Sequence, residues 1–331
     1  MLFQPNRTLI ICEMSQTYEG SYEVARRLVQ AAIAANADAI KFQVFAADEL
    51  STTDYKHYDL FKRLEFTGEQ WGNLIKQAHD GHILAFADVF GLASAQILLE
   101  QGIDGFKIHS TDIKNTPLLE YLAKTNKPLF LSTGGSYEEE IKKALSVLQS
   151  NNAAEVILMH GFQSYPTLVE HTNLYKIKAL ATTFNLPVGF ADHIDGDHDL
   201  RYDLCTMAMG MGVRVLEKHI TLERLLKMED YESALNPTDF KKFVERVRQL
   251  DQAFGLETTT VSESETAYRQ VTKKHLVAGR DLAEGTVITE TVIVMKRTAE
   301  TYEFLDRDAI LGKTLTQALK PDQVIRLEFL K

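Results

Sequence analysis

Short apolar runs rich in β-branched residues recur along the first 255 residues of the chain, and amphipathic stretches separate nearly all of them. Each run predicts a buried strand, and each stretch with apolar residues at helical spacing predicts a helix. The predicted strands cover residues 9–13, 39–44, 83–87, 105–110, 128–135, 156–160, 188–193 and 213–220.

Polar residues mark the starts of several predicted helices. Ser21 is a suitable N-cap for the first helix, and Thr67 with Gln70 forms a capping box for the helix that follows. Ser136 and Glu139 predict a further capping box after the fifth strand. Such caps satisfy backbone N–H groups at a helix start, so they support the alternation of strands and helices.

Strands that alternate with helices pair in parallel, and about eight such units over roughly 250 residues predict a (β/α)8 TIM barrel. An open doubly wound sheet is the alternative. Polar residues decide between them, because a barrel gathers the carboxyl ends of its strands into one mouth. These residues are Glu13, Lys41, Lys107, Ser132, His160, His193 and His219.

The alternating pattern ends near Gly255. Residues 256–266 are polar and without periodicity, which predicts a linker. Short strand-like pieces follow at residues 275–278 and 292–295. The sequence therefore predicts a catalytic barrel domain over residues 1–255 and a small second domain over residues 267–331.

Composition favours a cytoplasmic globular protein. Of the 331 residues 45% are hydrophobic, and the formal charge is −10 without a long basic run, which argues against nucleic acid or a membrane surface as a partner. No run approaches the ~18 apolar residues of a transmembrane helix, and the N-terminus shows no signal pattern. Cys12 and Cys205 lie in apolar runs, so both are predicted to be reduced.

Two histidines suggest a metal site. His193 and His219 end neighbouring predicted strands, where two imidazoles suit a divalent transition-type metal. Glu217 shares the face of His219, whereas Lys218 points the other way, because side chains alternate along a strand. Asp192 could orient His193 or bind the metal directly. The alternative is a pair of histidines that only form hydrogen bonds.

Lysines suggest an anionic substrate. Lys41, Lys107 and Lys127 lie in or beside predicted strands, and a buried ammonium group requires an anion. They could bind phosphate or carboxylate, form internal salt bridges with Glu13 and Glu217, or provide a Schiff base. Those two glutamates are equally candidates for general acid and base. The turn after the fifth strand, from Ser132, could also bind an anion at a helix N-terminus.

The order of these residues resembles the sialic acid synthase family, whose enzymes condense phosphoenolpyruvate with an N-acetylated amino sugar. The small C-terminal segment resembles the family's antifreeze-like (SAF) domain, through residues 274–282 and Lys296-Arg297. In the barrel, the resemblance rests on Glu13, Gly20, Lys41-Phe42-Gln43, Lys107-Ile108, Lys127-Pro128, Ser132-Thr133-Gly134, His160, Tyr165-Pro166, Val188-Gly189, Asp192-His193, Glu217-Lys218-His219, Asp230 and Ser233.

The resemblance implies a role for each candidate residue. It implies Mn2+ or another divalent metal on His193 and His219, and a homodimer with exchanged small domains in which Arg297 reaches a substrate in trans. Protons would be handled by Glu13 and Glu217, with Asp192 as a third catalytic candidate. Phosphoenolpyruvate would be bound by Lys41, Lys107, Lys127 and Ser132, and the sugar by Gln43, Gln163, Tyr165, Asp230 and Arg297.

The chain also departs from the family pattern. Thr17-Tyr18 replaces an Asn-His pair, Gln163 an asparagine, Gly161 a cysteine and Ala191 a serine. Residues 87–89 replace a Ser-Thr-Pro run, and Thr298-Ala299 a Pro-Gly pair. Most changes fall where sugar contacts are expected, which predicts retained phosphoenolpyruvate chemistry with a changed acceptor. An inactive or divergent sugar-binding barrel and a Schiff-base aldolase are the alternatives.

Overall fold

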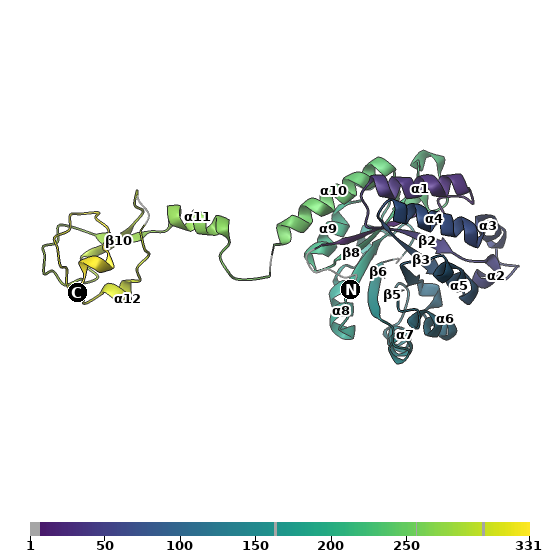
Figure 1. Cartoon of the computed structure of the whole chain (residues 1–331), viewed down its shortest axis with the longest axis horizontal. Helices are drawn as coiled ribbons and strands as arrows, with labels where there is room; N and C mark the ends of the chain where they lie inside the picture. The colour runs from purple at the N-terminus through teal and green to yellow at the C-terminus, as the bar shows by residue number, and fades with distance from the viewer. Residues whose placement is uncertain (1–6, 162–163, 256, 300–301) are drawn as a thin grey trace. The chain divides into compact units, whose positions relative to one another are not determined.

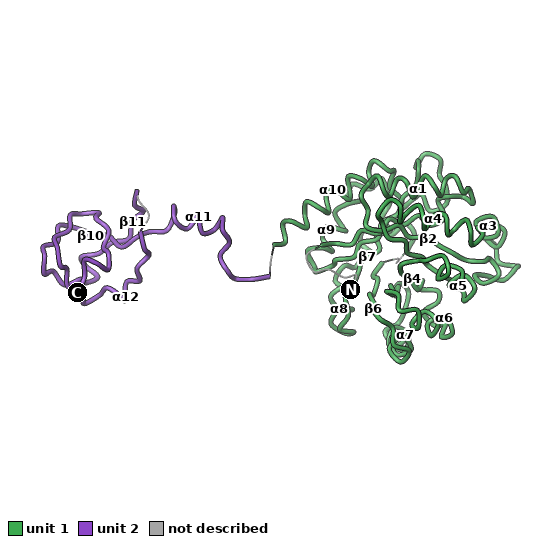
Figure 2. The backbone as a smooth tube through the Cα atoms, in the orientation of Figure 1, with its two compact units in different colours: residues 1–256 green, residues 257–331 purple. Residues whose placement is uncertain are grey.

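The computed structural model describes residues 7–161, 164–255, 257–299 and 302–331. The chain divides into two compact units, Met1–Leu256 and Glu257–Lys331, which Figure 2 shows in different colours. Each unit is described by itself.

The first unit is built on eight parallel strands. These are β1 (Leu9–Glu13), β2 (Ala39–Val44), β3 (Leu84–Val89), β4 (Gly105–Ile108), β5 (Pro128–Ser132), β6 (Glu155–Gly161), β7 (Val188–Asp192) and β8 (Val215–Ile220). Each strand pairs with the next, and β1 also pairs with β8, so the sheet closes. A short β9 (Ala234–Leu235) pairs with the end of β8. The closure confirms the predicted TIM barrel over the open sheet.

Helices lie around the outside of the barrel (Figure 1). They are α1 (Tyr22–Ala34), α2 (Ala47–Leu50), α3 (Tyr58–Leu64), α4 (Gly68–Asp80), α5 (Leu92–Glu100), α6 (Thr116–Ala123), α7 (Glu138–Ser150), α8 (Tyr175–Phe184), α9 (Asp203–Gly210) and α10 (Pro237–Phe254).

Alternation along the strands sorts the apolar residues into two layers. Ile10 and Cys12 pack in the large cluster between strands and helices, whereas Ile11 belongs to a smaller cluster inside the barrel. Phe86 and Phe130 contact each other in that inner cluster, with ring centroids 5.1 Å apart. This apolar filling occupies the interior below the carboxyl ends of the strands, so polar side chains on the same faces lie above it.

Two details of the predicted elements were wrong. Helix α7 starts at Glu138, and the Glu140 carboxylate accepts the Tyr137 N–H at 2.8 Å, so the capping interaction lies one residue beyond the predicted Ser136–Glu139 pair. Strand β3 extends two residues past the predicted end, because residues 88 and 89 continue the ladder opposite Lys107 and Ile108.

The capping box at Thr67 is present as predicted. Gln70 N donates to Thr67 Oγ1 at 3.2 Å, and Thr67 N donates to Gln70 Oε1 at 2.9 Å. We expect Thr67→Ala to lower the free energy of unfolding by about 1 kcal/mol, because α4 loses a cap. Denaturant unfolding measures this, with Thr182→Ala on the exposed part of α8 as the control. Equal losses in both variants would contradict the assignment.

The second unit is small and has its own core. It contains α11 (Glu263–Thr272), the antiparallel pair β10 (His275–Ala278) and β11 (Ile293–Lys296), and α12 (Arg307–Ile310). The irregular linker predicted over residues 256–266 is wrong in part, because α11 begins at Glu263 with a capping box between Ser262 and Glu265. The apolar core of this unit includes Leu276, Ile288, Ile310, Leu315 and Ile325.

Within the described ranges, no helix has both the length and the apolar character needed to cross a membrane.

Candidate active site

A cavity of about 650 Å3 opens at the carboxyl ends of the barrel strands. Strand residues, with His193 directly after β7, form its charged floor, and residues of the following loops form its walls. The floor consists of Glu13, Lys41, Asp88, Lys107, Glu217, His193 and His219. All seven are buried. The barrel therefore brings most of the predicted site residues together.

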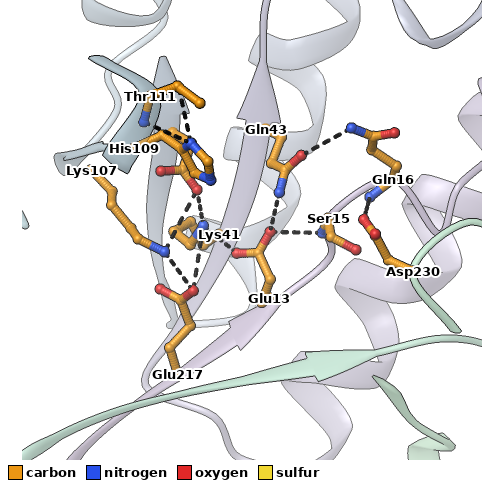
Figure 3. Close-up of polar contacts among 11 residues, drawn as sticks. Glu13, Ser15, Gln16, Lys41, Gln43, Lys107, His109, Thr111, Glu217 and Asp230 are labelled. Carbon is orange, nitrogen blue, oxygen red and sulfur yellow. Dashed lines mark hydrogen bonds and ion pairs between the residues drawn. The ribbon is translucent and has the colours of Figure 1, made fainter. Parts of the chain in front are cut away.

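Lysine and carboxylate groups form one network on this floor (Figure 3). Lys41 Nζ lies 2.5 Å from Glu13 Oε2 and 3.7 Å from Glu217 Oε1, and it also forms an ion pair with Asp88. Lys107 Nζ donates to Glu217 Oε1 at 2.6 Å and lies 3.8 Å from Asp88 Oδ2. Three carboxylates thus share two ammonium groups.

This environment gives the two glutamates different pKa values. Burial raises the pKa of Glu13 to about 8, and the Glu217 and Asp88 carboxylates add to the rise against the opposing Lys41 ammonium. Burial would also raise the pKa of Glu217, but Lys107 and Lys41 outweigh it and hold that pKa below the usual glutamate range. At neutral pH, Glu13 is therefore the proton donor of the pair and Glu217 the anion.

The two histidines suit a metal ion. Their ring centroids are 4.8 Å apart. His193 Nδ1 lies 2.9 Å from the Ala191 carbonyl oxygen, which can only accept, so this nitrogen carries the proton and Nε2 has the lone pair. His219 Nδ1 is buried and has no hydrogen-bond partner among the described residues. Burial lowers the pKa of His193 to about 4 and holds the pKa of His219 well below the usual histidine range, so both rings are neutral.

Neutral imidazoles are what a divalent metal requires as ligands. The described part of the chain contains no cluster of three or more histidine, cysteine or acidic side chains arranged around a metal position. Solvent or substrate could supply further ligands to a metal bound by His193 and His219. The two histidines fit a catalytic site of this open kind.

Three of the predicted sugar-binding residues line the same cavity: Gln43, Tyr165 and Asp230. Gln43 Nε2 lies 3.4 Å from Glu13 Oε1, and Gln16 connects Gln43 to Asp230 through its side chain and its backbone N–H (Figure 3). The Tyr165 ring is 6.4 Å from the His193 ring. These polar groups lie beside the predicted catalytic groups.

An apolar wall faces the outer part of the cavity. Tyr55 stacks on Phe61 with a centroid distance of 6.0 Å, and Phe90 also lines this wall. Tyr55 is 46% exposed, so its ring is available to a ligand. These residues follow β2 and β3, and the sequence reasoning missed them because no polar pattern marks them.

Asp192 points away from this cavity. Its carboxylate accepts from Lys218 Nζ at 2.7 Å and from the Ile194 N–H at 3.0 Å, on the side where Cys205 of α9 packs. His160 also faces the helices, where its Nε2 lies 2.8 Å from the Thr172 carbonyl oxygen. This position does not fit the catalytic role predicted for Asp192. His193 points inward, and neighbouring residues along an extended chain point to opposite sides.

Lys127 lies at the opposite end of the barrel. It precedes Pro128, the first residue of β5, whereas the cavity lies beyond the last residues of the strands. This position therefore does not fit the prediction that Lys127 binds phosphoenolpyruvate. Ser132 ends β5 on the correct side but does not line the cavity.

Two predicted sugar-binding residues remain. Gln163 falls outside the described residues. Arg297 belongs to the second unit, where it lines a separate cavity of about 520 Å3 together with Lys296, Tyr302 and Arg326. Its Nε donates to the Thr272 carbonyl oxygen at 3.2 Å.

Asp88 is the functional candidate that sequence reasoning did not select. Asp88 lies two residues after Phe86, so both side chains are on the inward face of β3. A predicted strand that included residue 88 would therefore have placed Asp88 in the mouth. The substitution of the Ser-Thr-Pro run at residues 87–89 was the available signal.

Sequence models of known families match both units. The model of the NeuB family matches residues 28–259, and the model of the SAF domain matches residues 274–331. The chain belongs to the NeuB family. This membership confirms the resemblance to sialic acid synthases, and with it the prediction of a carbon–carbon bond-forming enzyme of that type.

Individual relatives of the NeuB type are similar over nearly their whole length. The N,N'-diacetyllegionaminic acid synthase of Campylobacter jejuni is 32% identical over 97% of this chain and 99% of its own length. The N-acetylneuraminate-9-phosphate synthase of Homo sapiens is 28% identical over 96% and 91%. The solved structure of the sialic acid synthetase of Leptospira borgpetersenii with citrate has a TM-score of 0.74 and 29% identity, over 80% of this chain and 92% of that one.

Proposed function

We propose that this protein is a nonulosonic acid synthase that condenses phosphoenolpyruvate with an N-acetylated amino sugar, such as N-acetylmannosamine or a diamino-sugar relative. One observation carries the proposal: a NeuB-family barrel gathers two lysines, two differently protonated glutamates and two neutral histidines in one cavity. The legionaminic, pseudaminic and sialic acid synthases among its relatives support this substrate class.

The reaction forms one carbon–carbon bond, and at C2 a carbon–oxygen bond from water replaces the bond to phosphate. C3 of phosphoenolpyruvate bonds to the aldehyde carbon of the open-chain sugar, and water adds to C2. The C2–O bond to the phosphate group then breaks, and inorganic phosphate leaves with both electrons of that bond. The product is an α-keto acid with three more carbons than the sugar.

Residues of this chain take distinct parts in that sequence. Lys41 and Lys107 bind the carboxylate and phosphate of the donor. Protonated Glu13 gives a proton to the developing alkoxide, and anionic Glu217 stabilises positive charge at C2 and accepts a proton from the water. A divalent metal such as Mn2+ held by His193 and His219 would polarise the aldehyde oxygen.

The lysine network argues against a Schiff-base aldolase. Burial alone would lower the pKa of Lys41, but Asp88, Glu13 and Glu217 outweigh it and raise that pKa well above its ordinary value. A protonated amine is not a nucleophile. Trapping of a lysine by borohydride in the presence of pyruvate would support the aldolase instead.

A phosphate-release assay tests the proposal. The purified protein is incubated with phosphoenolpyruvate, Mn2+ and a panel of N-acylated amino sugars, and we expect phosphate release that depends on both metal and sugar. Binding of sugars without turnover by any member of the panel would indicate an inactive sugar-binding barrel. The homodimer with exchanged domains, the trans contact of Arg297 and the cytoplasmic location stay predictions.

A further inference from the structure

Asp88 lies between the two lysines that are expected to bind the donor. In the sheet register Asp88 is opposite Gln43 of β2 and Lys107 of β4. Its side chain is buried, and the same oxygen, Oδ2, contacts Lys41 Nζ and lies 3.8 Å from Lys107 Nζ. An oxygen of a bound phosphate or carboxylate group would occupy a similar position between two ammonium groups.

The carboxylate also completes the charge balance of the floor. Because Glu13 is protonated at neutral pH, Asp88 and Glu217 are the two anions that pair with Lys41 and Lys107, and the floor has no net positive charge left for an anionic donor. The second oxygen of Asp88, Oδ1, is buried and has no hydrogen-bond partner within the described residues. A buried carboxylate oxygen without a donor is costly, and Glu217 Oε2 is in the same state, so the described residues leave the carboxylates of the floor incompletely satisfied.

We propose that Asp88 is a specificity-determining residue that competes with the anionic donor for Lys41 and Lys107. It occupies the anion position in the absence of substrate, and its charge repels the phosphate and carboxylate groups that must approach the same lysines. An anionic ligand therefore binds only after it displaces the Asp88 carboxylate from the two lysines. The inference rests on the proposed function only for the identity of the donor.

Binding measurements test this competition directly. Phosphoenolpyruvate and inorganic phosphate are titrated calorimetrically into the wild-type protein and into Asp88→Asn and Asp88→Thr. We expect Kd for both anions to fall by about tenfold or more in each variant, equivalent to ~1.4 kcal/mol. In steady-state kinetics KM for phosphoenolpyruvate should fall as well, while KM for the sugar stays unchanged.

Asp48→Asn is the matched control. Asp48 lies on α2 with an exposed carboxylate paired to Lys62, so its variant changes the net charge equally without touching the two cavity lysines. Its Kd values should equal those of the wild type. Comparable tightening in Asp48→Asn would show a general charge effect and overturn the inference.

Two further outcomes would also overturn it. Unchanged or weaker anion binding in both neutral Asp88 variants shows that the carboxylate does not compete. Failure of both variants to fold shows that Asp88 is needed for stability instead. Tighter phosphate binding without any synthase turnover supports the inference while contradicting the proposed function, so the two can fail separately.

Discussion

Replacing Lys41 by methionine is expected to lower the free energy of unfolding of the barrel by about 3–5 kcal/mol, because a buried charge network loses its shared cation. Lys41 is 1% exposed and contacts Glu13, Asp88 and Glu217. Methionine replaces the apolar stem of the lysine but not its ammonium group, so it leaves buried carboxylates without a partner. Denaturant unfolding followed by the fluorescence of Trp71 measures the loss, because this single tryptophan lies in the barrel core.

Two further variants test whether the loss of stability comes from the buried charge network around Lys41. Lys62→Met removes a lysine that is 39% exposed and paired with Asp48 and Glu65, so its loss should stay within about 1 kcal/mol. The double variant Lys41→Met/Asp88→Asn removes a cation together with an anion and should recover part of the stability. A double variant less stable than Lys41→Met alone would contradict the charge-balance argument.

His219→Ala is expected to reduce turnover about a thousandfold, equivalent to ~4 kcal/mol of lost transition-state stabilisation. The substitution leaves His193 as the single imidazole at the proposed metal position, so Mn2+ should bind too weakly to polarise the aldehyde. The wild-type protein should also gain thermal stability from Mn2+, by about 2.7 kcal/mol at a hundredfold excess over Kd, and the variant should not.

The control for this variant is His171→Ala. His171 is exposed on the short 3-10 helix Val169–His171 and does not line the cavity. Its variant should keep both turnover and the Mn2+ shift. Full activity of the wild-type enzyme after thorough chelation would show instead that the two histidines serve another purpose.

Strand alternation predicted much of the site from the sequence. Once Val215 is assigned to the barrel interior, Glu217 and His219 must face the mouth and Lys218 must face the helices, as the structure has them. The same rule would have turned Asp192 outward, because its neighbour His193 points inward. The family resemblance had assigned Asp192 and His193 to one site without regard to the side of the strand to which each side chain points.

Other errors concerned the position of a residue along its strand. Lys127 was expected to bind the donor, but β5 starts at Pro128, as predicted, and a residue ahead of a barrel strand lies at the far end from the mouth. Asp88 was missed because β3 was expected to end at residue 87. The protonation of Glu13 could not be predicted either, since it depends on which charges the closed barrel places around it.

The register of the closed sheet has a consequence for laboratory evolution. Backbone hydrogen bonds fix Glu13 opposite both Lys41 and His219, so the donor and metal positions cannot move independently of the barrel. Tyr55 and Phe61 come from the connection between β2 and β3, which no such ladder holds. A mutant library confined to residues 50–61 can therefore reshape the apolar wall for new acceptors and leave the strand-borne charges in place.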